Sequence, residues 1–171
     1  MSPVAIVVGL VAAQRIVEIA YATRNTRALK RRGGIEHGRG HYPLLVVIHT
    51  AWLAALLLFV PGDAPLSWAW LGLFLAMQAL RLWVIASLGP YWTTRIITLA
   101  GASLVRRGPY RFLRHPNYVV VAVEILALPL AFGAWRIALV FSLLNLAALA
   151  WRIRVEEQAL APQRLVPPQR L

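Results

Sequence analysis

Residues 114–157 read RHPNYVVVAVEILALPLAFGAWRIALVFSLLNLAALAWRIRVEE and contain the pattern that decides the fold. An apolar stretch separates a basic cluster at its start from Glu156 and Glu157 at its end. Two apolar helices joined by a turn fit this pattern, since 118–132 would rise about 22 Å and 135–157 would descend about 33 Å at 1.5 Å per residue. Such a hairpin returns both polar clusters to one face, where they can form one site.

The whole chain has the composition of an integral membrane protein. Of its 171 residues, 60% are hydrophobic and 14% are charged, which lies outside the range of ordinary soluble domains. Runs of roughly 17–25 apolar residues are long enough to cross a bilayer as helices. Candidate spans are 3–22, 44–60, 66–88, 118–132 and 135–152. We therefore expect an all-α membrane protein with about five transmembrane helices, although the short fourth span is also compatible with four spans and a re-entrant piece. The domain would cover 1–160, with a flexible tail over 161–171.

The net charge of +12 is concentrated in particular connections between the apolar spans. Basic residues gather in 24–39 and 95–114, with Arg152 and Arg154 near the end, whereas 61–65 carries only an aspartate. By the positive-inside rule the basic connections and the C-terminus are cytoplasmic, and the N-terminus lies outside. An odd number of spans, such as five, places the two ends of the chain on opposite sides of the membrane as this assignment requires. We interpret the charge as a topology signal, aided by attraction to anionic membrane lipid, and expect no nucleic-acid partner.

Metal and thiol chemistry find little support in the sequence. The chain has no cysteine, which excludes disulfides, thiolate metal ligands and a cysteine nucleophile. Glu36, His37 and His41 are candidate metal ligands by proximity, but the glycines among them disfavour a ligand-bearing helix and no third ligand has a spacing that fixes it. We expect no metal, and a loop over 36–43 that folds against the cytoplasmic face.

The segment 108–118, which reads GPYRFLRHPNY, has the properties of an anion-binding corner. Pro116 predicts the start of a helix, because proline is favoured at a first helical position. The free N–H groups of that helix would lie beside Arg114 and His115 and attract an anion. The glutamate pair at the other end of the hairpin supplies the opposite charge. A ligand with a carboxylate and cationic groups, such as an amino acid carrying a sulfonium, would match both halves.

Each polar cluster also has a simpler interpretation. Arg152 with Glu156, and Arg154 with Glu157, have the i,i+4 and i,i+3 spacing of surface ion pairs. The basic residues before the hairpin fit a positive-inside anchor with its aromatic belt. Glu124 favours a functional site over these simpler interpretations. Burying an acid two turns deep in a span costs free energy, so such a residue is by default a functional candidate.

Besides Glu124, the residues Arg81 and Trp92 are candidates for contact with a substrate. Asn117 and Glu124 are seven residues apart and share a face of the fourth span. Arg81, in the third span, either extends to the interface or pairs with an acid inside the bundle. Trp92 belongs to an aromatic and cationic segment, 91–95, that is suited to the membrane interface.

The hairpin resembles the isoprenylcysteine carboxyl methyltransferase family of membrane methyltransferases. The residues that carry the resemblance are Arg114-His115-Pro116-Asn117-Tyr118 and, after two apolar helices, Glu156-Glu157. Within the family the chain is similar to a bacterial branch found with type III polyketide synthases, whose members methylate alkylpyrones or phenolic lipids. The features shared with that branch are Gln14-Arg15 with Glu18, Arg24-Asn25, 36–43, 91–94 and 152–157. The resemblance covers the chain to about Leu160.

The resemblance implies an S-adenosylmethionine site formed by the hairpin and the segment before it, with Arg154 reaching the substrate end. Together with the anion-binding corner, it makes the cofactor-binding candidates Tyr110, Arg114, His115, Pro116, Asn117, Tyr118, Glu156 and Glu157. The catalytic candidates are His115, Arg154 and Glu156, and the substrate candidates are Glu124, Arg81 and Trp92. Many members have a glycine two residues after the tyrosine, where this chain has Val120. That departure bears on how closely a cofactor approaches the backbone.

The expected reaction is methyl transfer to an oxygen of a lipophilic acceptor at the membrane. An alkylpyrone or phenolic lipid hydroxyl is favoured as the acceptor, and a prenylcysteine-type carboxylate comes next. Positioning is the main contribution to such a reaction, and a phenol would also benefit from a general base such as His115 or a glutamate. An NADPH-dependent membrane sterol or enone reductase and a non-catalytic lipid-binding membrane protein are the alternatives. We expect a location in a bacterial inner membrane, and the oligomeric state stays open.

Overall fold

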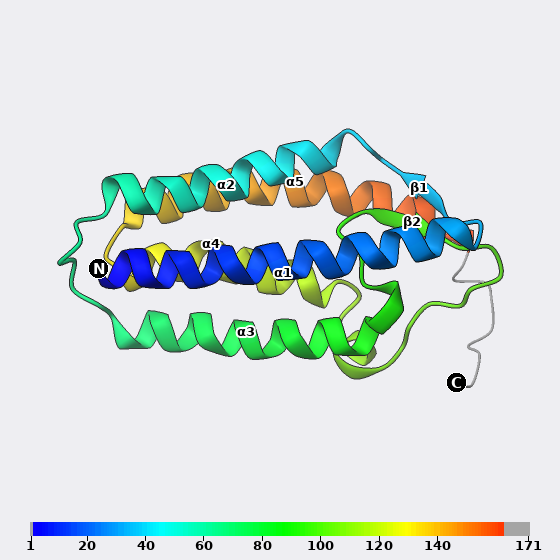
Figure 1. Cartoon of the computed structure of the whole chain (residues 1–171), viewed down its shortest axis with the longest axis horizontal. Helices are drawn as coiled ribbons and strands as arrows, with labels where there is room; N and C mark the ends of the chain where they lie inside the picture. Colours follow the sequence, from blue (N-terminus) through cyan, green and yellow to red (C-terminus); the bar gives the residue numbers. More distant parts are fainter. Residues whose placement is uncertain (1, 163–171) are drawn as a thin grey trace.

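The computed structural model describes residues 2–162, and its five helices run along one axis (Figure 1). The helices are α1 Pro3–Arg31, α2 His41–Phe59, α3 Trp68–Leu88, α4 Pro116–Ala131 and α5 Trp135–Leu160. Two short strands, β1 Ile35–His37 and β2 Ile96–Thr98, and two 3-10 turns, η1 Gly89–Tyr91 and η2 Gly108–Arg111, complete the described part. Four of the described helices, α1, α2, α3 and α5, are long and apolar enough to cross a membrane. The expected all-α membrane fold is confirmed.

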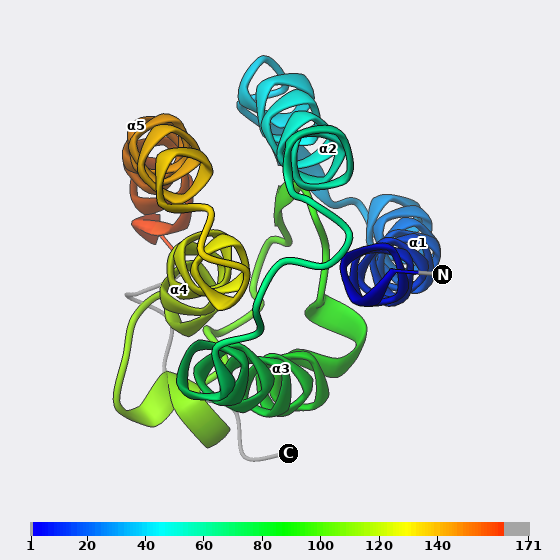
Figure 2. The ribbon, with the colours of Figure 1, turned by 90° about the vertical axis from the view of Figure 1, so that its left-hand side faces the viewer.

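Helix α4 is shorter than the other four and lies inside the bundle. Its 16 residues rise about 24 Å, and they begin at Pro116, the position that the sequence predicted. Ten of these residues are buried, and Figure 2 shows α4 between α3 and α5, the two helices that it packs against. Because protein surrounds most of α4, its polar residues Asn117 and Glu124 face the interior of the bundle rather than lipid.

A tight turn at Gly133 connects α4 to α5. Gly133 has a φ of 69°, a conformation that favours glycine. The N–H of Ala134 donates to the carbonyl of Pro129 at 2.9 Å and closes the end of α4. Helix α5 then runs back over 26 residues, ten more than α4 has, so its last turns reach past the level at which α4 begins.

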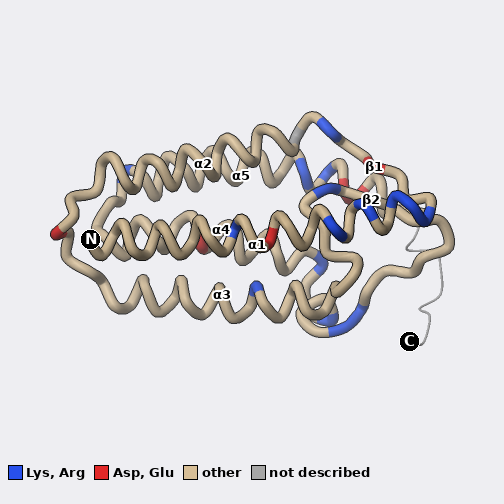
Figure 3. The backbone as a smooth tube through the Cα atoms, viewed as in Figure 1, with Lys and Arg blue, Asp and Glu red and all other residues tan. Residues whose placement is uncertain are grey.

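Helices α1 and α5 continue beyond the apolar spans that hydropathy indicates, to Arg31 and Leu160. Together with the connection between α3 and α4 they form a polar end of the bundle. Figure 3 shows that most lysines and arginines gather at this end, while the connection between α2 and α3, which contains Asp63, lies at the opposite one. The charge asymmetry of the sequence is therefore also an asymmetry of the folded molecule along its long axis.

A two-stranded ribbon joins the two basic connections at this polar end. Strands β1 and β2 pair antiparallel, with Glu36 opposite Ile97. The Glu36 carboxylate binds Lys30 at 2.5 Å and Arg95 at 2.6 Å. Burial acts to raise the pKa of Glu36, but the hydrogen bonds and charges of Lys30 and Arg95 outweigh it and hold the pKa below its usual value. The expected loop over 36–43 is therefore part of a strand at its start, and its end, from His41, is already helical.

Candidate active site

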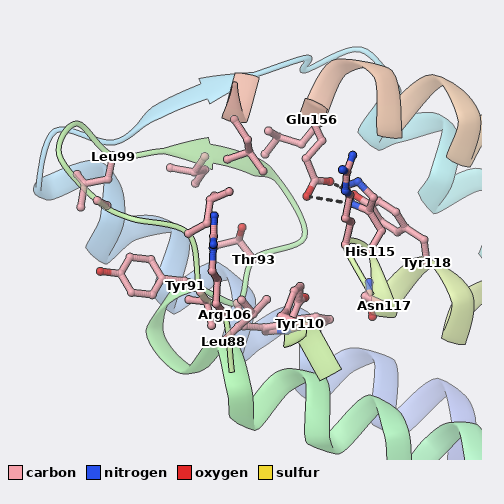
Figure 4. Close-up of a pocket in the computed structure, with 18 of the residues that line it drawn as sticks. Leu88, Tyr91, Thr93, Leu99, Arg106, Tyr110, His115, Asn117, Tyr118 and Glu156 are labelled. Atoms are coloured by element: carbon pink, nitrogen blue, oxygen red, sulfur yellow. Dashed lines mark hydrogen bonds and ion pairs between the residues drawn. The ribbon is translucent and has the colours of Figure 1, made fainter. Parts of the chain in front are cut away.

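The hairpin brings its two polar clusters together, as the residue spacing predicted (Figure 4). His115 Nε2 and a Glu157 oxygen lie 2.7 Å apart, and His115 Nδ1 is 3.8 Å from Glu156. The Tyr118 hydroxyl donates a hydrogen bond to Glu156 and accepts one from Arg152 Nε at 2.7 Å. Helix α5 therefore contributes a guanidinium and two carboxylates to one face, and the start of α4 contributes an imidazole and a phenol.

Local geometry explains why these groups face one another. His115 is the N-cap of α4, and its ring stacks on Tyr118 with centroids 5.3 Å apart and planes at 15°. Arg152 and Glu156 are one helical turn apart on α5, so both reach the Tyr118 hydroxyl. The Arg152 guanidinium also lies 5.6 Å from the centre of the Tyr118 ring, a cation–π distance. Tyr118 is thus the centre of this cluster.

A cavity of about 680 Å³ opens beside the cluster at the polar end of the bundle, and we call it the cofactor cavity. Much of its aliphatic lining comes from β2 and the segment after it, including Ile97, Leu99 and Val105. Its charged and titratable lining consists of Tyr91, Arg95, Arg106, Tyr110, Arg111, Arg114, His115, Tyr118, Arg152 and Glu156. Burial, with a smaller contribution from the charge of Glu156, raises the pKa of Tyr110, so this phenol is neutral.

Gly108 sets the position of Tyr110 against α3. Its φ is 57°, and a Cβ at this position would lie 2.0 Å from Ser87 Oγ on α3. Arg107 Nε donates to the carbonyl of Ser87 at 2.8 Å and fixes the same segment. The close backbone contact brings η2, and with it Tyr110, to the wall of the cofactor cavity.

A second cavity of about 210 Å³ lies inside the bundle, and we call it the acceptor cavity. All five helices contribute to its wall, which is largely apolar through residues such as Leu45, Leu53 and Val121. Its charged lining is Arg15, Glu18, Arg81 and Arg152. The residues that line both cavities are Trp92, Thr93, Asn117, Tyr118 and Arg152. The two cavities therefore meet at one wall.

Glu124 lies behind the acceptor cavity in a network of polar side chains. It is 2% exposed and accepts hydrogen bonds from Gln78 at 2.7 Å, from Arg15 at 2.9 Å and from Arg81. Arg81 also reaches Glu18, at 3.2 Å. Of the two predictions for Arg81, pairing with an acid inside the bundle is therefore the one that the structure shows. Glu124 itself does not line either cavity, and it binds two of the three arginines that line the acceptor cavity.

The other candidate residues occupy different positions. Arg114 is exposed and lines the cofactor cavity, and Pro116 is buried as the first residue of α4. Arg154 is exposed and lines neither cavity, whereas Arg152, one turn before Glu156, lines both. Sequence reasoning missed Arg152 because its i,i+4 spacing to Glu156 fitted a surface ion pair. The same spacing indicates a shared helix face, and that was the signal for its place in the site.

Val120 is the position at which the chain departs from the pattern described above. Its side chain is fully buried and lines neither cavity. The Val120 side chain faces the packed interior of the bundle, so it does not narrow the cofactor cavity. The valine that stands in place of this glycine therefore takes no space from either cavity.

The fold and the site define a class: a helical membrane protein with a cavity of cofactor size at its polar end, joined to an apolar cavity inside the bundle. Residues 70–162 match the Isoprenylcysteine carboxyl methyltransferase (ICMT) family, and the chain belongs to that family. The matched range contains nearly all of α3, the whole hairpin and both glutamates. It leaves out α1 and α2, which form part of the acceptor cavity.

Similar proteins extend the match over nearly the whole chain. "Uncharacterized protein YpbQ" of Bacillus subtilis (strain 168) is 38% identical over 160 residues, which are 91% of this chain and 95% of that protein. An "Uncharacterized protein" of Haemophilus influenzae (strain ATCC 51907 / DSM 11121 / KW20 / Rd) is 28% identical over 152 residues, 86% of this chain and 88% of its own length. No solved structure matches the chain. Family membership makes the protein an integral membrane methyltransferase, and enzymes of this family generally use S-adenosylmethionine.

Proposed function

We propose that the protein is an S-adenosylmethionine-dependent O-methyltransferase that acts on a lipophilic acceptor within the membrane. The observation that carries this proposal is the shared wall between a polar cavity and an apolar one. A methyl donor in the first and an acceptor in the second would meet at that wall. Holding two reactants together in this way is the principal means by which such a reaction is accelerated.

The residues of the cofactor cavity fit S-adenosylmethionine. Its volume of about 680 Å³ lies within the range of small-molecule sites. Glu156 faces the cavity with a negative charge, which suits the ammonium and sulfonium groups, while Arg111 and Arg114 suit the carboxylate. His115 and Glu157 lie 2.7 Å apart, and this contact holds the His115 ring in place at the edge of the cofactor cavity. The bound cofactor would supply an electrophilic methyl group.

The acceptor cavity suits the polar head of a lipid and the first part of its tail. Its aliphatic wall is continuous with the membrane-embedded part of the bundle, and its charged groups come from α1, α3 and α5. An alkylpyrone or phenolic lipid hydroxyl is the favoured acceptor, and a prenylcysteine-type carboxylate comes next. His115 and Glu156 stay as catalytic candidates, and Arg81 and Trp92 as acceptor contacts. Arg154 is exposed, and we assign its substrate role to Arg152 instead.

The orientation that we propose has the polar end on the cytoplasmic side of a bacterial inner membrane, with the N-terminus outside. Because the chain has no native cysteine, single cysteines report on this directly. With Asp63→Cys, a membrane-impermeant maleimide should label intact cells. With Arg39→Cys, it should label only opened cells. The reverse labelling pattern would overturn the orientation.

Transfer of a labelled methyl group tests the proposed function. Purified protein in lipid nanodiscs is incubated with methyl-labelled S-adenosylmethionine and a lipid extract, and labelled lipid is the expected product. S-adenosylhomocysteine should raise the melting temperature and NADPH should not. A shift with NADPH alone would support a membrane reductase. No shift with either ligand, together with no labelled lipid, would support a non-catalytic lipid-binding protein.

A further inference from the structure

A short basic segment, 106–114, reads RRGPYRFLR and packs against the last turns of α3. A Cβ at Gly108 would lie 2.0 Å from Ser87 Oγ and 3.1 Å from Trp83 Nε1, so the segment touches α3 at this level. Figure 2, which looks along the bundle from its opposite end, shows η2 in yellow-green outside α3 and α4. Because α3 is long and apolar enough to cross a membrane, the segment lies beside the end of a spanning helix, where lipid surrounds the protein.

The side chains at this end of α3 mark the level as a membrane interface. Trp83 is 52% exposed, and tryptophan is enriched where a spanning helix meets the lipid headgroups. One turn after Trp83, the Ser87 carbonyl accepts a hydrogen bond from Arg107 Nε at 2.8 Å, which holds the segment at this height. The segment is therefore fixed at the level of the headgroups.

Two apolar side chains of the segment, Phe112 and Leu113, are exposed. Phe112 is 76% exposed and Leu113 is 44% exposed, and Phe112 lines neither cavity. The N–H groups of both residues donate to the Pro109 carbonyl, at 3.1 Å and 3.0 Å. The pair therefore presents apolar side chains without open N–H groups, as contact with the apolar part of a bilayer requires. Insertion of the phenyl ring among acyl chains would remove the free-energy cost of its contact with water.

The charges of the segment suit an anionic surface. It has no acid, and its exposed arginines are Arg106, Arg107, Arg111 and Arg114. None of these arginines forms an ion pair with another residue of the described range 2–162. Elsewhere at the polar end, by contrast, Glu36 binds both Lys30 and Arg95. Like charges this close in the chain repel one another, and anionic headgroups would relieve that repulsion.

We propose that 106–114 is a docking surface for anionic phospholipid, and we call it the docking segment. Phe112 and Leu113 lie at the boundary of the acyl chains, and the arginines bind headgroup phosphates. A bilayer fits this surface better than a protein partner, because the segment lies beside a helix that itself runs through lipid. Tyr110 and three of the arginines also line the cofactor cavity, so docking holds this wall of the cavity at the membrane surface. Under the proposed function, which only this last consequence assumes, a water-borne donor and a membrane-borne acceptor meet there.

A single fluorescent label tests the depth of the docking segment. The chain has no native cysteine, so Phe112→Cys places one bimane label at the exposed position. In nanodiscs, lipids with brominated acyl chains should quench this label more strongly than acrylamide in the water does. Arg32→Cys is the control, because Arg32 is exposed at the C-terminal end of α1, and its label should respond mainly to acrylamide. A label at Phe112→Cys that responds only to acrylamide would overturn the proposal.

Brominated phosphatidylglycerol and brominated phosphatidylcholine, at the same mole fraction in nanodiscs of unlabelled phosphatidylcholine, test the headgroup. The anionic lipid should quench the label at Phe112→Cys about twice as strongly, because it gathers at the arginines. A triple variant removes charges from the docking segment: Arg106→Gln, Arg111→Gln and Arg114→Gln. Its matched control removes the same charge from exposed positions of α1: Arg24→Gln, Arg27→Gln and Arg31→Gln. Only the first variant should abolish the preference for the anionic lipid, and an equal loss in both would refute the docking surface.

Both measurements use protein without methyl donor or acceptor, so they stand apart from the proposed function. A preference for the anionic lipid that persists in excess inorganic phosphate, at constant ionic strength, would support lipid docking. Loss of the preference in phosphate would assign the surface to a free anion and contradict lipid docking. Equal quenching by the two lipids in a protein that methylates lipid would refute the docking surface and leave the methyltransferase intact. An intact preference in a protein that methylates no lipid would instead contradict the proposed function alone.

Discussion

Replacing Glu156 by glutamine should weaken the binding of S-adenosylmethionine while leaving the fold intact. The Glu156 carboxylate lines the cofactor cavity and accepts a hydrogen bond from Tyr118. Its side chain is 23% exposed, and one oxygen lies 3.8 Å from His115 Nδ1. Glutamine has the same length and can still accept the hydrogen bond of Tyr118. The substitution therefore removes the negative charge and little else.

The expected loss follows from the difference between charged and neutral hydrogen bonds. Hydrogen bonds that involve a charged group contribute about 1.5–3 kcal/mol, and neutral ones about 0.5–1.5 kcal/mol. The difference of about 1–2 kcal/mol corresponds to a rise in Kd of about 5- to 30-fold. Because Glu156 is partly exposed, solvent screening places the expected value in the lower part of that range.

Isothermal titration calorimetry in nanodiscs measures this effect with both the methyl donor and its demethylated product. If Glu156 faces the sulfonium, Glu156→Gln should weaken S-adenosylmethionine more than S-adenosylhomocysteine, since only the former carries that charge. If it faces the ammonium, both should weaken equally. Asp63→Asn is the control, because Asp63 lies in the connection at the opposite end of the bundle (Figure 3). A folded Glu156→Gln protein with a Kd within twofold of the wild type would refute the assignment of the cofactor cavity.

Three further substitutions test the architecture around the site. Glu124→Leu should destabilise the protein by about 3 kcal/mol in reversible unfolding in detergent, because Arg15 and Arg81 lose their most buried shared carboxylate and keep only Glu18; a loss below 1 kcal/mol would show that the network is not tightly coupled. Gly108→Ala should lower the melting temperature more than Gly133→Ala, since both have positive φ but only Gly108 lacks space for a Cβ; equal effects would show that backbone strain alone matters. Glu36→Gln should lower the melting temperature at pH 7, and the difference should shrink as the pH falls through 4.5 and below, because the depressed pKa of Glu36 stabilises the fold only while the carboxylate is ionised; a difference that persists at pH 3 would contradict this.

The membrane class and the hairpin follow from the sequence because they depend on short-range patterns. Apolar runs of a given length require helices that satisfy their own backbone groups in lipid. A proline at a first helical position and a glycine in the turn set where α4 begins and ends. Once the start and the end of α4 are known, the helical rise per residue places Glu156 and Glu157 of α5 at the level of His115. Hydropathy predicts where helices cross the membrane but not how far they extend beyond it, and α1 and α5 both extend further.

What only the tertiary structure decided is which side chains share a wall. Tyr118 could be placed near the glutamates from its spacing, but the choice of Arg152 over Arg154 depends on the rotation of α5 against α4. Trp92 reaches the same wall through a hydrogen bond from Asn25 on α1, a residue 67 positions away in the sequence. Spacing along one helix specifies a face, whereas the partner of that face is chosen by packing among five helices. The sequence therefore determined an apolar membrane hairpin whose two ends carry polar clusters, and the packing of the bundle determined that these clusters lie where two cavities meet.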